Sequence, residues 1–139
     1  MRLEVSTRIA AAIERVWATI LDVERWHEWT ESITSIEKME PGELKAGSKV
    51  RIKQPKLPPA VWTVTAIEPG RRLEWQAKGP GSNTVAWHEA EPEGGGAKAT
   101  LGIDQQGVFF ALAGWYFNGM TRRYVDMELA GLKHRSEDG

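Results

Sequence analysis

The first thirty residues change from a two-residue to a helical repeat of apolar positions. Residues 2–9 alternate polar or charged side chains with apolar ones, which predicts a half-buried strand. In residues 11–21 the apolar side chains recur at helical spacing, which predicts an amphipathic helix, although its start lacks a polar cap. Val23, Trp26 and Trp29 then continue as a second, short helix. The pattern therefore predicts one strand followed by two short helices.

Between Glu31 and Gln106 the period of two returns and is interrupted by turn residues. The interruptions are Pro41-Gly42, Pro55 with Pro58-Pro59, Pro69-Gly70, Gly79-Pro80-Gly81 and Gly94-Gly95-Gly96. They leave about five or six segments of strand length. Because short loops join alternating strands, we expect an antiparallel meander with one face in water.

The chain from Val108 to about His134 contains no proline and no run of turn residues, which predicts one long helix. Its first half is apolar nearly all round, and its second half is amphipathic. In the second half we expect Met120, Tyr124, Met127 and Leu132 on the inner side, against Arg122, Arg123, Asp126 and Glu128. Residues 136–139 are expected to form a disordered tail.

Together these elements predict an α+β fold in a single domain over residues 1–135. A curved antiparallel sheet of about six or seven strands would wrap around the long C-terminal helix, with the two short helices between its first two strands. Only the long helix is large enough to cover the inner face of the sheet. Because a strongly curved sheet on one helix need not fill its interior, we expect a cavity beneath the helix.

Composition narrows the chemistry of the 139 residues. Lys plus Arg number 18 and Asp plus Glu 19, so the net charge is −1 and the basic excess of a general nucleic-acid binder is missing. The absence of Cys excludes disulfides, thiolate zinc sites and a cysteine nucleophile. Seven Trp residues suit either a filled core or the wall of an apolar pocket, and both interpretations stay open.

The sequence also bears on location and partners. The start lacks the apolar core of a secretory signal, so we expect a cytoplasmic protein. The longest uncharged apolar stretch, Val108 to Met120, is too short to span a bilayer core of about 30 Å. No HxH or HExxH spacing occurs, so we expect neither a metal nor a cofactor. We expect a monomer or a weak homodimer.

The spacing Ile9-(x)6-Val16-Trp17-(x)3-Leu21-Asp22-(x)3-Trp26 resembles the opening of the START-like superfamily, also called SRPBCC or polyketide cyclase/dehydrase-like. Residues 62–75 resemble its central hairpin, and residues 128–133 resemble the close of its C-terminal helix. The resemblance covers about residues 1–135 and implies a helix-grip fold with a cavity between sheet and helix. This chain has Ala at positions 10–12, where the family usually has Pro before the first helix.

His88 and Tyr116 are the candidate catalytic residues. Because Glu89 and Glu91 need solvent, His88 is expected on the inner face of its strand and Trp87 on the outer face. Either a bulge shifts this phase, or a neighbour covers Trp87. The structural alternative for His88 is a hydrogen-bonded histidine of the core. Tyr116, on the long helix, would offer its hydroxyl to the cavity.

Strand phase and helical spacing together predict an aromatic cavity for a flat or elongated apolar ligand. Core packing is the alternative for each residue taken singly. The expected lining consists of Trp26, Trp29, Val50, Ile52, Trp62, Val64, Leu73, Trp75, Leu101, Ile103, Phe109, Leu112, Ala113, Tyr116, Phe117 and Met120.

Three functions remain open, because members of the superfamily include ligand carriers, aromatic-polyketide cyclases, lipid-transfer domains and activators of chaperones. The first is a carrier or sensor of a small hydrophobic molecule. The second is a cyclase or dehydratase that acts on a polyketide-like or aromatic substrate. The third is a protein-interaction module of the chaperone-activator type with a filled core. An open cavity with convergent titratable groups would favour the enzyme, and a cavity with apolar walls and one hydrogen-bonding group would favour the carrier.

Overall fold

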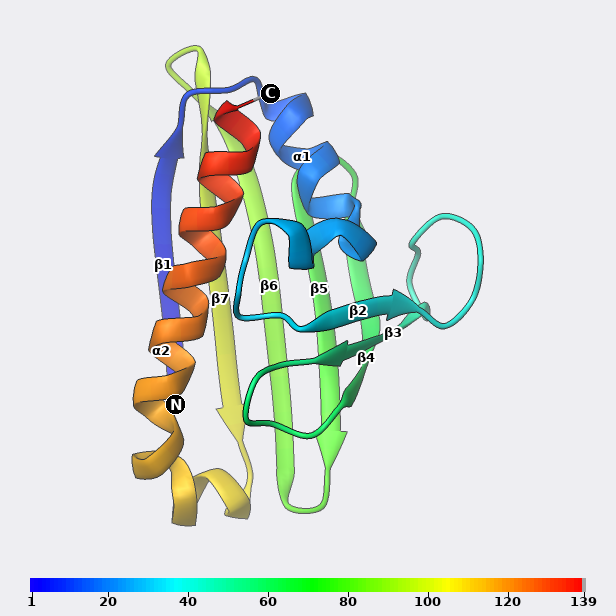
Figure 1. The fold of residues 1–139 in the computed structure, drawn as a ribbon, viewed down its shortest axis with the longest axis vertical. Helices are drawn as coiled ribbons and strands as arrows, with labels where there is room; N and C mark the ends of the chain where they lie inside the picture. Colours follow the sequence, from blue (N-terminus) through cyan, green and yellow to red (C-terminus); the bar gives the residue numbers. More distant parts are fainter. Residues whose placement is uncertain (139) are drawn as a thin grey trace.

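The computed structural model describes residues 1–138. Its elements are β1 (Arg2–Ile9), α1 (Ile13–Leu21), η1 (Val23–Glu28), β2 (Ser35–Lys38), β3 (Lys49–Lys53), β4 (Ala60–Glu68), β5 (Arg72–Gly79), β6 (Ser82–Glu93), β7 (Gly96–Gln106) and α2 (Val108–Glu137). The strands form one antiparallel sheet in the order β1-β7-β6-β5-β4-β3-β2 (Figure 1). The predicted α+β helix-grip fold, with two short helices between the first two strands, is confirmed.

The two short helices close one end of the sheet. α1 begins at Ile13, two residues later than expected, after the extended and uncapped residue Ala12. η1 is a 3₁₀ helix in which the side chain of Trp26 is buried. The indole N–H of Trp26 donates to the carbonyl of Ile20 at 3.0 Å, which ties η1 to α1 and fixes the orientation of the ring.

The half of the sheet beneath α1 is a filled core. The inner-face residues of β6 and β7 are small here, because Ala90, Ala97 and Ala99 present only methyl groups. This lets α1 and the end of α2 approach closely, and Val16 and Leu132 are buried in the same cluster. Gly131 makes a further close approach possible, since a Cβ there would lie 2.0 Å from the main-chain oxygen of Trp29, just after η1.

Trp87 lies on the outer face of β6, as the alternation of the strand predicts. No bulge interrupts β6, where Trp87 pairs with Gly102 across the ladder, and the register shift of the sheet lies in β4 instead. The indole covers Gly102, whose missing Cβ would lie 1.9 Å from the ring. The guanidinium groups of Arg2 and Arg72 lie 4.6 and 5.6 Å from the ring centroid, and the indole N–H donates to Glu4 at 2.9 Å. Neighbours therefore cover Trp87, and its exposed fraction is 3%.

The long C-terminal helix is a single helix, as predicted, and it packs on β1 and β7 (Figure 1). It runs to Glu137, so residues 136 and 137 belong to the helix and not to the tail that the sequence suggested. Ser136 is buried, and its carbonyl accepts a hydrogen bond from Arg15 that holds the last turn against α1. Residue 139 of the expected tail lies outside the described residues. Within residues 1–138 there is no helix with the length and hydropathy that a membrane span needs.

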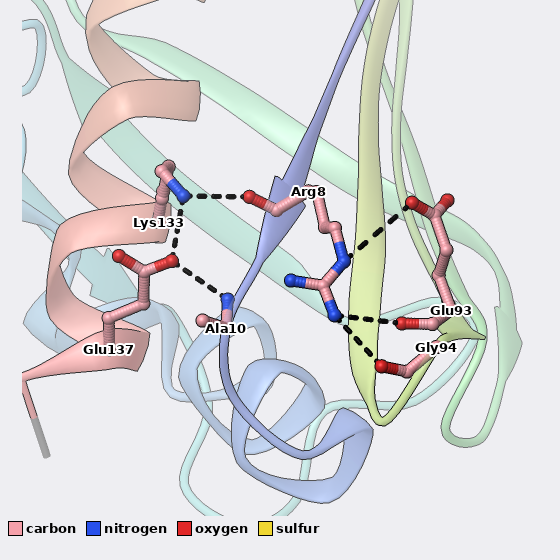
Figure 2. A network of polar contacts seen from close by, with 6 residues as sticks. All are labelled: Arg8, Ala10, Glu93, Gly94, Lys133 and Glu137. Atoms are coloured by element: carbon pink, nitrogen blue, oxygen red, sulfur yellow. Dashed lines mark hydrogen bonds and ion pairs between the residues drawn. The ribbon is translucent and has the colours of Figure 1, made fainter.

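A polar network attaches the last turns of α2 to the sheet (Figure 2). The carboxylate of Glu137 accepts the main-chain N–H of Ala10 at 2.8 Å and the ammonium of Lys133 at 2.7 Å. Lys133 also donates to the carbonyl of Arg8, whose guanidinium donates to the carbonyl of Gly94 in the β6–β7 hairpin. Since the network joins three elements distant in sequence, it fixes the C-terminal end of α2.

Candidate functional site: a cavity beneath α2

A cavity of about 620 Å³ lies between the sheet and α2, on the side away from α1. The β3–β4 loop and the β5–β6 hairpin also border it. The sheet leaves this volume open because its inner-face residues are small at this end, notably Ala77, Thr84 and Ala86. A volume of this size lies within the range of about 300–1,000 Å³ that is typical of small-molecule sites.

Three indole rings form one wall of the cavity. Trp75 of β5 lies at its centre, with ring centroids 5.2 Å from Trp26 and 6.0 Å from Trp62. Their planes are tilted by 54° and 43°, which is an arrangement favoured between aromatic rings. These rings, held by η1, β4 and β5, make a rigid apolar surface against which a flat ligand can pack.

A buried polar pair stands beside the indoles. The Nε2 of His88 on β6 lies 2.7 Å from the Oε1 of Glu128 on α2, and the two side chains are 7% and 15% exposed. The His88 ring lies 4.8 Å from that of Trp26 and 5.5 Å from that of Trp75. Because a carboxylate can only accept, the ionised Glu128 takes its hydrogen bond from an N–H at Nε2. Nδ1 has no hydrogen-bond partner among the described residues.

Further polar groups lie toward the other end of the cavity. The amide of Gln105 on β7 donates to the hydroxyl of Thr121 at 3.1 Å, while its Oε1 has no partner among residues 1–138. The hydroxyl of Tyr124 donates to the carbonyl of Pro55 at 2.6 Å, which ties α2 to the β3–β4 loop. Gln105 pairs with Thr84, four residues from His88 along β6, so the two polar positions are about 13 Å apart.

The structure places many of the sequence-predicted residues on the wall of the cavity. Those that line it are Trp26, Ile52, Trp62, Trp75, Leu101, Ile103, Phe109, Phe117 and Met120, together with His88. Val50, Val64 and Leu73 belong instead to the filled core, where all three side chains are buried. Trp29 packs against α2 at Gly131, outside the cavity. That these residues bind a ligand stays a prediction.

The positions of Leu112, Ala113 and Tyr116 need correction, because none of them lines the cavity. Leu112 and Tyr116 are exposed on the outer side of α2. The first half of the helix is apolar all round, so its sequence does not show which side faces the sheet. The ring of Phe117, one residue and about 100° further along the helix, faces the cavity instead. Tyr116 is therefore not in a position to act as a catalytic residue.

Sequence reasoning missed several residues of the site. Glu128 was expected on the outer side of α2, yet it faces the cavity, and so does Thr121, whose side of the helix was not predicted. Tyr124 lies on the inner side, as expected. Their positions follow from Phe117 at steps of three or four residues, which is the available signal. Among residues 1–138, no group of three His, Asp or Glu side chains could hold a metal ion.

Comparison with known proteins agrees with this architecture. No curated protein matches the sequence. TTHA0849 from Thermus thermophilus has a TM-score of 0.79 at 17% identity, over 98% of this chain and 97% of that one. A START superfamily protein from Mycobacterium smegmatis has a TM-score of 0.76 at 12% identity, over 96% and 97% of the two chains. The di-domain ARO/CYC StfQ from the steffimycin biosynthetic pathway has a TM-score of 0.79 at 12% identity, over 99% of this chain and 50% of that one.

At these identities the solved structures show a shared fold alone. A family model described as "Polyketide cyclase / dehydrase and lipid transport" matches residues 1–137, nearly the whole chain. The sheet, the long helix and the cavity between them agree with that match. The chain therefore belongs to the polyketide cyclase/dehydrase and lipid transport family.

Proposed function

We propose that the chain binds a small hydrophobic, aromatic molecule in its cavity, as a carrier or sensor. The observation that carries this proposal is the cavity of about 620 Å³ whose wall contains three indoles. Burying a flat apolar ring against such a surface releases water from both, at about 25 cal/mol for each Å² of apolar surface buried. The family description, which includes lipid transport, supports a ligand of this kind.

The polar pair adds a second requirement to the ligand. The Oε1 of Glu128 accepts the hydrogen bond from His88, and its Oε2 makes no hydrogen bond within the described residues. Because Glu128 lines the cavity, this oxygen can accept a hydrogen bond from a ligand hydroxyl. We therefore expect a preference for aromatic rings that carry a hydroxyl group over the same rings without one.

Titration with 2-naphthol and with naphthalene, followed by NMR of the tryptophan indole N–H signals, tests this proposal. The signals of Trp62 and Trp75 should shift, while that of Trp87, on the other face of the sheet, should not. The hydroxyl should strengthen binding about tenfold, as expected for a hydrogen bond to a charged group. Equal shifts at Trp87, or no saturable shift at all, would contradict the proposal.

Two Ala→Phe substitutions test whether the ligand binds in the cavity or on the outer surface of α2. Ala86→Phe places a ring inside the cavity and should abolish the shifts, while dispersed spectra report that the fold is kept. Ala113→Phe adds the same ring outside the cavity and should leave binding unchanged. Undiminished binding to Ala86→Phe would show that the ligand lies elsewhere.

A second candidate, a cyclase or dehydratase, is favoured by the contact between His88 and Glu128. In a cyclisation of this type a base removes a proton beside a carbonyl, the carbanion attacks a second carbonyl, and the new alkoxide takes up a proton before water is lost. Glu128 and His88 supply a carboxylate and an imidazole next to an apolar cavity, as such proton transfers require.

The enzyme candidate is tested by incubating the protein with a linear aromatic poly-β-ketone and following ring formation by absorbance. His88→Gln and Glu128→Gln should each lower the rate by at least about 100-fold. If the wild-type protein forms the ring no faster than buffer does, the enzyme candidate is excluded for this substrate and only the carrier proposal remains. The filled-core interaction module receives no support, because the cavity is open.

A further inference from the structure

The first turns of α2 carry an exposed apolar surface, which we call the helix rim. It consists of Val108, Phe109, Leu112, Trp115 and Tyr116, with exposed fractions of 67%, 42%, 75%, 80% and 65%. Exposed apolar side chains in such a continuous group mark an interaction site more often than scattered ones do. Trp115 and Tyr116 contact each other, with ring centroids 5.9 Å apart.

The helix rim borders the mouth of the cavity. Phe109 belongs both to the rim and to the cavity wall. Its main-chain N–H donates to the carbonyl of Gly81 at 2.8 Å, so the β5–β6 hairpin lies against the start of α2. Pro58, Pro59 and Val61 in and after the β3–β4 loop line the same cavity. Three segments, residues 54–61, 77–82 and 105–123, therefore bring exposed apolar side chains together around the mouth.

All charges on these three segments are positive. Lys56, Lys78, Arg122 and Arg123 are exposed, and none of them forms an ion pair within residues 1–138. No Asp or Glu occurs in the three segments, although the whole chain has a net charge of −1. The rim thus adjoins segments that carry four cations without an ion pair in the described chain, while the next carboxylates along β7 and α2 are Asp104 and Asp126.

The combination of exposed apolar side chains and nearby positive charges favours some partners of the helix rim over others. In a two-fold dimer through the helix rim, the cations of one copy would face those of the other, which opposes association. An anionic lipid surface offers the complementary charge, and its headgroup region accepts Trp and Tyr while shorter apolar side chains reach the acyl chains. We propose that the helix rim docks the protein on anionic membranes, with the mouth of the cavity facing the bilayer.

Docking does not depend on what the cavity binds. It places the opening on the surface from which an apolar molecule can move between bilayer and cavity without crossing water. Lys133 and Glu137 attach the C-terminal turns of α2 to the sheet (Figure 2). These turns are at the other end of the helix from the rim, so docking should leave the attachment intact. Each basic residue near the anionic surface should strengthen the partitioning of the protein onto the membrane about fivefold.

Co-sedimentation with vesicles tests the proposal. The protein should bind vesicles of phosphatidylcholine with about 30% phosphatidylglycerol, and bind pure phosphatidylcholine at least about tenfold more weakly, since each basic residue near an anionic surface contributes about fivefold. High salt should weaken the binding because it screens the cations. Leu112→Ser/Trp115→Ser should abolish it, whereas Met39→Ser, at another exposed apolar residue, should not. Arg122→Gln/Arg123→Gln should weaken it about 20-fold, and the matched pair Lys45→Gln/Arg51→Gln should change it little.

Several results would overturn membrane docking. One is failure to bind anionic vesicles, and another is binding that Leu112→Ser/Trp115→Ser leaves unchanged. A dimer in analytical ultracentrifugation that this double variant dissociates would assign the rim to self-association. Binding of 2-naphthol, measured without vesicles, should survive the double variant because neither residue lines the cavity. Failure of docking and failure of the ligand proposal are therefore distinguishable.

Discussion

The contact between His88 and Glu128 should contribute coupling energy that a double-mutant cycle can measure. We consider Glu128→Leu, His88→Leu and the double variant. In Glu128→Leu the imidazole loses its one hydrogen bond, because Nδ1 already lacks a partner among the described residues. With side chains 7% and 15% exposed, water replaces the lost partner poorly. Leaving a buried polar group unpaired costs about 1–3 kcal/mol, and we expect each single variant to lose this much free energy of unfolding.

The double variant should lose much less, because no polar group is then left without a partner. Replacing both members of a buried polar pair by apolar residues is often neutral or stabilising. With each single variant losing about 1–3 kcal/mol and the double variant close to none, the expected coupling is the sum of the two single losses, about 2–6 kcal/mol in favour of the pair. Urea denaturation at pH 7, followed by tryptophan fluorescence, measures this coupling energy. The comparison holds when the m-values of the variants equal that of the wild type.

A coupling below about 0.5 kcal/mol, the usual error of additivity, would refute this reasoning. It would mean that the two side chains do not interact in solution. If the double variant is as stable as the wild type but no longer prefers 2-naphthol to naphthalene, the pair is retained for its chemistry and not for stability. A matched measurement on His88→Gln shows how much of the effect needs an imidazole.

Three further predictions concern parts of the fold outside the cavity. Gly102→Ala should destabilise by about 1–3 kcal/mol in urea denaturation, because the new methyl group overlaps the ring of Trp87; a neutral effect would contradict the contact. Gly131→Ala should lower the melting temperature despite the higher helix propensity of Ala, since its Cβ meets main-chain atoms of Trp29. The main-chain N–H of Ala10 holds the pKa of Glu137 below its usual value of 4.5, so Glu137 stabilises the fold above that pH and stops doing so as the pH falls. The melting temperature of Glu137→Gln should be lower than that of the wild type at pH 7, and the difference should shrink as the pH falls below 4.5.

The strands and the long helix follow from the sequence because their apolar period records which face is buried. The alternation in β6 placed His88 inside and Trp87 outside, and the structure confirms both positions. The sequence left open whether a bulge shifts β6 or a neighbour covers Trp87. The ring of Trp87 lies over Gly102, a residue of another strand, and nothing in the sequence around Trp87 indicates this contact.

The side of α2 that faces the cavity was harder to predict. In its first half nearly every residue is apolar, so Tyr116 and Phe117 are equivalent by type although only Phe117 lines the cavity. In its second half Glu128 was expected in solvent because a carboxylate is normally exposed. Its burial depends on His88, 40 positions away along the chain, and no helical pattern contains that information.

The unequal attachment of α2 divides the molecule into two regions that tolerate change differently. The C-terminal turns are held by Arg15, Lys133 and Glu137, so substitutions there affect the global unfolding free energy. The first turns, from Val108 to Met120, make no side-chain hydrogen bond or ion pair with the rest of the described chain. Their amides should therefore exchange with solvent through local opening, at a lower free energy than those near Leu132. Substitutions in these turns should change access to the cavity at little cost to stability, so ligand preference can change while the rest of the fold is kept.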